Sequence, residues 1–244
     1  MVSLTKREAD RKLANVIQDL EFMRAPSKGL HDEVGDYSSM LSLRLIAAAV
    51  YSWLANEDVV AFKSHLKRST DLLAGLFARA AAGDNIPRSR VEGQVDRLLL
   101  HSWAADVNRT KDDVGGAWDL FLIGEEAHPS RLALSRALVA VLENRDGAEG
   151  TVVELRSACT RPARNYLGYA TVLHGVLARN QQAVNRGVEE LLVGHAKECR
   201  PGGELAYDPE RYLYVSVIGI AKFAQARGLT VTPRPPLVPC ELLR

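Results

Sequence analysis

The stretch "ATVLHGVLARNQQAVNRGVEELL", residues 170–192, has the pattern of two helices joined by a short turn at Asn180. Asn tolerates the left-handed or helix-capping conformations that such a turn needs, so the second helix can fold back on the first. The segments 53–66 and 141–155 share this layout, with Asn at a helix end and a Leu 10 or 11 residues later. Asn56, Asn144 and Asn180 are separated by 88 and 36 residues, so the hairpins predict a helical stack without a fixed repeat period. The alternative is three ordinary helix turns, which predicts the same fold class.

Helical periodicity continues along the rest of the chain, and strand-like alternation is rare. Glycine and proline breaks divide the chain into about ten helices. We expect these helices at 4–24, 37–56, 58–82, 88–107, 117–123, 129–143, 148–159, 163–179, 182–199 and 209–227. The sequence therefore predicts an all-α fold, an irregular stack of antiparallel helical hairpins in a single domain over residues 1–244.

The composition is that of a globular protein, with 47% apolar and 25% charged residues among 244. The net charge of +1 does not indicate a dedicated nucleic-acid binder, for which a basic excess is expected. Cys159, Cys199 and Cys240 are too far apart for a metal or redox motif and are typical of reduced thiols. The N-terminus lacks the apolar core of a signal peptide, and the apolar runs 45–55 and 212–224 are shorter than the roughly 20 residues that span a bilayer. We expect a cytoplasmic protein with no membrane partner.

The residue types that carry catalysis form no recognisable arrangement in this sequence. The six histidines are scattered, and "EEAH" at 125–128 supplies one Glu-x-x-His where a di-iron bundle needs two. In "HSWAAD", residues 101–106, the helical twist turns Asp106 about 140° away from His101. No Gly-x-Ser-x-Gly elbow or activated Cys signature occurs. We therefore expect no catalytic residue, no metal site, no cofactor and no enzymatic activity.

An acidic segment runs from Asp84 to Glu126, with nine acidic against five basic residues. Acidic side chains that surround an exposed aromatic residue would form a binding surface for a basic protein. The alternative is a loop whose aromatic residues are buried. The candidate partner-binding residues are Asp106, Asp112, Asp113, Trp118, Asp119, Glu125 and Glu126.

A basic segment follows, from residue 156 to residue 186, and contains five arginines and no acidic residue. Tyr166 and Tyr169 lie among the arginines. Such a face could meet phosphate groups or an acidic protein surface, and the alternative is a solvated helix face with tyrosines packed in the core. The residues of this alternative basic face are Arg156, Arg161, Arg164, Arg179 and Arg186.

The C-terminal segment "GIAKFAQARGLTVTPRPPLVPCELL", residues 219–243, begins in an apolar helix and breaks at Gly228. Glycine is the preferred residue just after a helix end, and Arg227 in the last turn interacts favourably with the helix dipole. Four prolines at 233, 235, 236 and 239 favour an extended chain. The leucines and valines around them can attach this chain to the core, so we expect an extended, proline-rich C-terminal strap.

The same region carries a family resemblance. The segment "DPERYLYVSVIGIAKFAQARGL" followed by "TVTPRPPLVPCELL", together with the helix pair at 170–192, resembles the C-terminal part of the immunity protein 49 family of bacterial polymorphic toxin systems. The likeness covers residues 163–243 and is one of layout: an apolar helix, an Arg-Gly-Leu break, a Pro-x-x-Pro stretch and a terminal Leu-Leu. That family has no catalytic residues to carry over.

The resemblance implies an all-helical cytoplasmic immunity protein that binds one cognate toxin domain and neutralises it by covering its active cleft. A basic nuclease-type domain would suit the acidic segment. The alternative is a helical-repeat scaffold or regulatory protein-binding domain without a toxin link. A third hypothesis is an all-α enzyme or a nucleic-acid binder that uses the basic face, which the near-neutral net charge disfavours.

Overall fold

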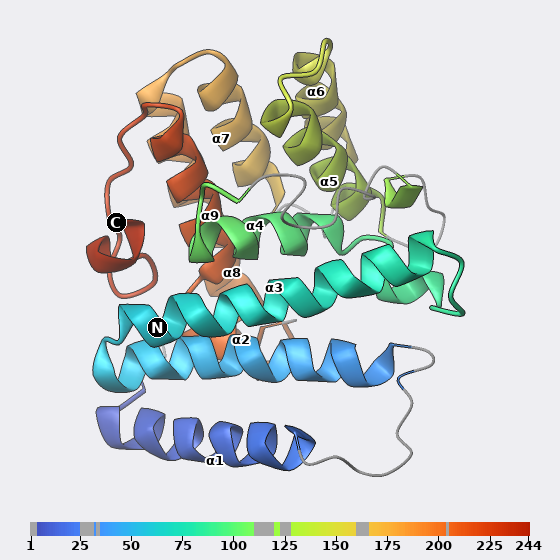
Figure 1. The fold of residues 1–244 in the computed structure, drawn as a ribbon. Coiled ribbons are helices and arrows are strands. Elements are labelled where there is room, and N and C mark those ends of the chain that lie inside the picture. Colours follow the sequence, from blue (N-terminus) through green and yellow to red (C-terminus); the bar gives the residue numbers. More distant parts are fainter. Residues whose placement is uncertain are drawn as a thin grey trace.

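The computed structural model describes residues 4–24, 32, 35–109, 120–122, 128–159, 166–203 and 205–244. Over these residues the protein is all-helical, as the sequence predicts, and contains nine α-helices and no strand (Figure 1). The nine helices are α1 (Lys6–Arg24), α2 (Asp36–Asn56), α3 (Val59–Ala81), α4 (Val95–Ala105), α5 (Pro129–Leu142), α6 (Ala148–Ala158), α7 (Leu167–Leu177), α8 (Gln181–Glu198) and α9 (Val215–Ala226). Short 3₁₀ helices also lie in these ranges, among them η1 (Arg88–Arg90), η5 (Pro209–Arg211) and η6 (Cys240–Leu243).

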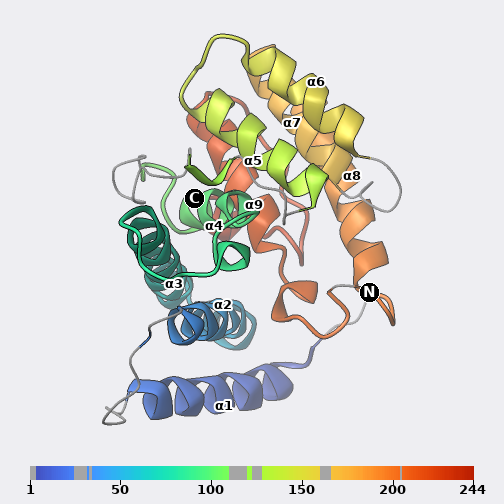
Figure 2. The same ribbon diagram turned by 90° about the vertical axis from the view of Figure 1, so that its right-hand side faces the viewer.

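Helices α1, α2 and α3 form an antiparallel layer across the lower half of the molecule (Figure 1). Figure 2 shows α4 and α9 in the middle of the protein, between this layer and the group formed by α5, α6, α7 and α8. One continuous core of buried apolar residues runs from α1 to the C-terminal segment. The helices therefore pack around a central pair, α4 and α9.

The three predicted hairpins are present, and each turn uses the left-handed or capping conformations expected of it. Asn144 between α5 and α6 has φ +50°. Between α2 and α3 the left-handed residue is Glu57 rather than Asn56, and Asp58 caps α3 by accepting a bond from Ala61 N. Between α7 and α8, Asn180 caps α8 by accepting from Ala183 N. The asparagine pattern thus located all three turns. Neighbouring residues supply further left-handed conformations: Glu57 in the first turn, Gly147 before α6 and Arg179 before α8.

Glycines set the closest approaches between helices. A methyl group on Gly219 of α9 would lie 1.9 Å from the carbonyl oxygen of Leu100 in α4. Beside this contact, the rings of Trp103 and Phe223 stack with centroids 4.3 Å apart. In the α7–α8 hairpin, a methyl group on Gly187 would lie 2.7 Å from the backbone nitrogen of Val172. Small residues at these positions let the helix backbones touch and fix the spacing of the stack.

Some predicted boundaries were wrong, for local reasons. The predicted helix 88–107 is the 3₁₀ turn η1 followed by α4, because Gly93 at φ +66° separates the two. The predicted helix 209–227 begins at Val215, because Pro209 opens a separate 3₁₀ turn. The predicted helix 117–123 falls mostly outside the described residues.

Helix α2 requires a correction to the argument about membrane spans. With 21 residues from Asp36 to Asn56, it is long and apolar enough to cross a bilayer. Most of it is buried inside the protein, however, where α1 and α3 pack against it. This burial is typical of a core helix.

The C-terminal strap packs as the sequence predicts. Gly228 adopts φ +83° directly after α9, and Arg227 donates to the carbonyl oxygens of Val141 and Leu142 at the end of α5. The strap is less extended than expected, because Arg234 and Val238 exchange backbone hydrogen bonds across a tight turn at the prolines. The apolar residues that attach the strap to the core are Leu229, Val231, Leu237, Val238, Leu242 and Leu243.

Candidate partner-binding site

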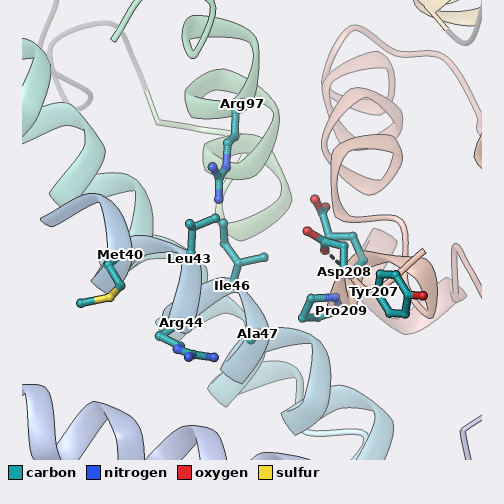
Figure 3. Close-up of a pocket in the computed structure, with 10 residues that line it drawn as sticks. Met40, Leu43, Arg44, Ile46, Ala47, Arg97, Tyr207, Asp208 and Pro209 are labelled. Carbon is teal, nitrogen blue, oxygen red and sulfur yellow. Dashed lines mark hydrogen bonds between the residues drawn. The ribbon is translucent and has the colours of Figure 1, made fainter. Parts of the chain in front are cut away.

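A cleft of about 540 Å³ opens between α2 and the segment around η5, with α4 behind it (Figure 3). Three large side chains on its lining are exposed to solvent: Met40 at 50%, Leu43 at 48% and Tyr207 at 93%. The full lining is Met40, Leu43, Arg44, Ile46, Ala47, Arg97, Tyr207, Asp208, Pro209 and Glu210. The cleft therefore combines an exposed apolar rim with a charged interior, and its volume lies in the range of ligand-binding sites.

Arg97 forms the inner end of this cleft. It projects from α4 into the space between α2 and residues 207–210 (Figure 3). Burial lowers the pKa of Arg97 below its ordinary value, while nearby Glu210 acts in the opposite direction. A guanidinium group stays charged in proteins even so. The fold thus holds a cation in a place that penalises its charge.

The acidic groups near Arg97 are held by other contacts. Asp208 accepts a hydrogen bond from Glu210 N at 2.8 Å and so caps η5. Glu210 Oε1 lies 3.4 Å from His101 Nε2. Burial acts to raise the pKa of Glu210, but the attraction of His101 and Arg97 outweighs it and the pKa falls below its ordinary value. Burial, followed by repulsion from Glu210, raises the pKa of Asp208.

His101, Glu210 and Ser216 resemble the members of a catalytic triad in type but not in arrangement. Ser216 Oγ lies 3.3 Å from His101 Nε2, the same nitrogen that faces Glu210. In a triad the serine and the acid contact opposite nitrogens of the imidazole, so that the acid orients the ring while the other nitrogen takes the proton. Here both groups compete for one nitrogen, so the cluster does not activate Ser216 as a nucleophile.

A second, smaller cavity of about 180 Å³ lies on the other side of Arg97 and Glu210, which line both spaces. Its polar wall is locked by internal contacts. Arg131 pairs with Asp96 at 3.2 Å, and His195 Nε2 lies 2.9 Å from the Glu210 carbonyl oxygen. These contacts, the second of which lies beside the cavity, join α4 to α5 and α8 to η5.

Most of the predicted acidic face lies outside the described residues, namely Asp112, Asp113, Trp118, Asp119, Glu125 and Glu126. Asp106 is described and exposed. Its backbone N–H donates to the Ser102 carbonyl oxygen at the end of α4, and its carboxylate accepts hydrogen bonds from Asn108. Three other acids of the acidic segment form ion pairs within the fold: Asp84 with Arg79, Glu92 with Arg88, and Asp96 with Arg131. Residues 84–109 contain four acidic and four basic residues, so the acidic excess of the segment comes from its later part.

The basic segment is divided between separate elements. Arg156 is exposed on α6, Arg179 lies in the α7–α8 turn, and Arg186 on α8 faces Glu190 at 3.9 Å. Arg161 and Arg164 lie outside the described residues. Tyr169 is buried, in agreement with the interpretation that it packs in the core.

Sequence patterns missed Arg97 and its surroundings. Arg97 counted only as one of five basic residues in the acidic segment, and Glu210 lies 113 positions further along the chain. The one local signal was "DPER" at 208–211, because Asp followed by Pro is typical of a helix start.

No group of three or more His, Cys, Asp or Glu residues within the described ranges could hold a metal ion. Comparison with known proteins adds no relative: no family model matches the chain, and neither a curated protein nor a solved structure matches it.

Proposed function

We propose that the protein is an immunity-type binding protein, which neutralises a cognate toxin domain by binding and covering it, and that the cleft between α2 and η5 is where the toxin docks. The observation that carries the proposal is the cleft itself, with Met40, Leu43 and Tyr207 exposed around its rim. Interfaces are enriched in aromatic residues and methionine at their centres. The family resemblance of residues 163–243 supplies the expectation that the partner is a toxin.

The geometry of the polar groups supports binding over catalysis. The one Ser–His–acid cluster among the described residues has both partners on a single imidazole nitrogen. Cys199 lies 3.6 Å from both ring nitrogens of His195, and burial raises the pKa of its thiol, which disfavours the reactive thiolate. An occluding binder needs neither group to react.

The test is protection of cells together with complex formation. The tagged protein is purified from its native host, and the partner is expressed in a sensitive strain with and without the protein. We expect a stoichiometric partner that kills cells unless this protein is present.

Two variants then locate the site. Leu43→Glu places a charge on the apolar rim and should abolish protection, whereas Val60→Glu, at a more exposed position outside the cleft, should not. A partner that is harmless when expressed alone would favour the scaffold alternative, and equal protection by both variants would remove the cleft as the docking site.

A further inference from the structure

Arg97, the cation at the inner end of the cleft, is not paired with any described residue. Arg97 forms no hydrogen bond and no ion pair with any described residue, although it lies within electrostatic range of Asp96, Asp208 and Glu210. Asp96 is bound to Arg131 at 3.2 Å, and Glu210 faces His101 at 3.4 Å. Asp96 and Glu210 thus lie against other side chains, while the guanidinium of Arg97 keeps its fork of N–H donors directed into the cleft.

The chemistry that matches this end of the cleft is a carboxylate. Arg and carboxylate pair through two parallel hydrogen bonds, and the pair is strong where water is excluded. A phosphate group carries up to two negative charges and would meet Asp208 and Glu210 on the same wall. A carboxylate carries a single negative charge, so it pairs with Arg97 and meets less repulsion from Asp208 and Glu210 than a phosphate group does.

Asp208 supplies a second element of recognition. Its Oδ1 accepts from Glu210 N, and no described residue donates to its Oδ2. Oδ2 is therefore able to accept an N–H from a molecule bound in the cleft. At the C-terminus of a polypeptide, the last residue carries both groups, because its backbone N–H and its carboxylate are attached to the same Cα atom.

The remaining walls of the cleft are apolar and favour an apolar side chain on the bound residue. Leu43, Ile46 and Ala47 from α2 face Pro209 across the cleft (Figure 3). Exposed Met40 and Tyr207 extend this apolar surface outward, which suits the chain that precedes a terminal residue.

We propose that the cleft binds the C-terminal residue of the partner protein: its carboxylate pairs with Arg97, its backbone N–H donates to Asp208, and its apolar side chain packs between α2 and Pro209. This inference rests on the proposed function, because it names the part of the partner that the same cleft recognises.

The test uses two synthetic probes and the full chain: acetyl-Gly-Gly-Leu with a free carboxylate, and the same peptide as its C-terminal amide. Binding is followed by the NMR signals of the arginine Nε–H groups during titration. We expect the acid to bind at least tenfold more tightly than the amide, a difference of about 1.4 kcal/mol. Arg97→Gln should remove that preference. Arg7→Gln is the matched control, because Arg7 is exposed on α1 and does not line the cleft, and it should keep the preference.

The comparison of acid with amide needs only the natural chain, so it decides the question even if a variant fails to fold. Equal binding of the two peptides would overturn the proposal. So would acetate that binds as tightly as the peptide acid, which indicates a free small anion, or inorganic phosphate that binds more tightly than either. The cell-protection assay is independent of the peptide titration. If the natural protein prefers the peptide acid but does not protect cells, the toxin link is contradicted. If it protects cells but shows no preference for the acid, the carboxylate site is contradicted.

Discussion

Replacing Gly219 by alanine tests the packing that holds the central pair of helices together. The added methyl group would lie 1.9 Å from the Leu100 carbonyl oxygen and 2.7 Å from the Leu100 carbonyl carbon. Ordinary contact begins near 3.4 Å, so α4 and α9 would have to separate locally by about 1.5 Å, the difference between 3.4 and 1.9. Both neighbouring atoms belong to the backbone, so no side-chain rotation relieves the clash.

Gly219→Ala should lose stability because the site becomes overpacked and because moving α4 away from α9 would loosen neighbouring contacts. These include the Trp103–Phe223 stack and the bond from Lys222 Nζ to the Ala104 carbonyl oxygen, at 3.2 Å. Overpacking costs roughly 1–3 kcal/mol, and this site is at the upper end of that range. The higher helix propensity of alanine returns about 1 kcal/mol. We expect a net loss of about 2 kcal/mol in the free energy of unfolding.

The assay is urea unfolding followed by circular dichroism, with Gly75→Ala as the matched control. Gly75 lies inside α3, where an added methyl group meets no atom within 4 Å. The same substitution there should increase stability by about 0.5–1 kcal/mol. The two variants therefore have opposite expected signs. If Gly219→Ala were as stable as Gly75→Ala, the close α4–α9 contact would be refuted.

Two further perturbations follow from the fold. Burial, assisted by repulsion from Lys63, lowers the pKa of Lys222 to about 8. Between pH 8 and roughly 10.5 the unfolded chain therefore binds a proton that the folded chain has lost. The free energy of unfolding should rise with pH across this window. Lys222→Met should remove this rise and add about 2 kcal/mol to the free energy of unfolding at pH 7, a value that allows for solvent screening. Urea unfolding at pH 7 and pH 10 checks this, and an equal change in stability between the two pH values for the natural protein and the variant would contradict it. Arg227→Gln should cost about 2 kcal/mol in urea unfolding, because Arg227 donates to the Val141 and Leu142 carbonyls and to Asn144 Oδ1, while the exposed Arg156→Gln should cost almost nothing; equal stability of the two variants would show that Arg227 does not hold α9 to α5.

Local sequence signals predicted the fold class because they concern neighbouring residues. Apolar periodicity and the asparagine turns lie within one hairpin, so the pattern itself contains the information. The Gly228 helix end and the buried apolar residues of the strap were predictable for the same reason. The 3₁₀ turn before α4 was not, because Gly93 alone does not tell a tolerated glycine in a helix from a break.

The cleft could not be predicted from the sequence, because its charges meet only through tertiary packing. Arg97 and Glu210 are brought together by the contact of α4 with α9 and of α2 with η5. In the sequence Arg97 sits beside Asp96, which suggests a neutral pair, yet Asp96 turns toward Arg131 on α5 instead. A half-buried cation such as Arg97, unpaired among the described residues, is recognisable only when the partners of every nearby acid are known.

The proposed function is that this protein protects cells by binding a toxin through the cleft between α2 and η5. The most direct measurement is the survival of cells that express the captured partner together with the natural protein, Leu43→Glu or Val60→Glu. We expect survival with the natural protein and with Val60→Glu, and killing with Leu43→Glu, while all three proteins remain folded. Survival with Leu43→Glu, or a partner that kills in the presence of the natural protein, would contradict it.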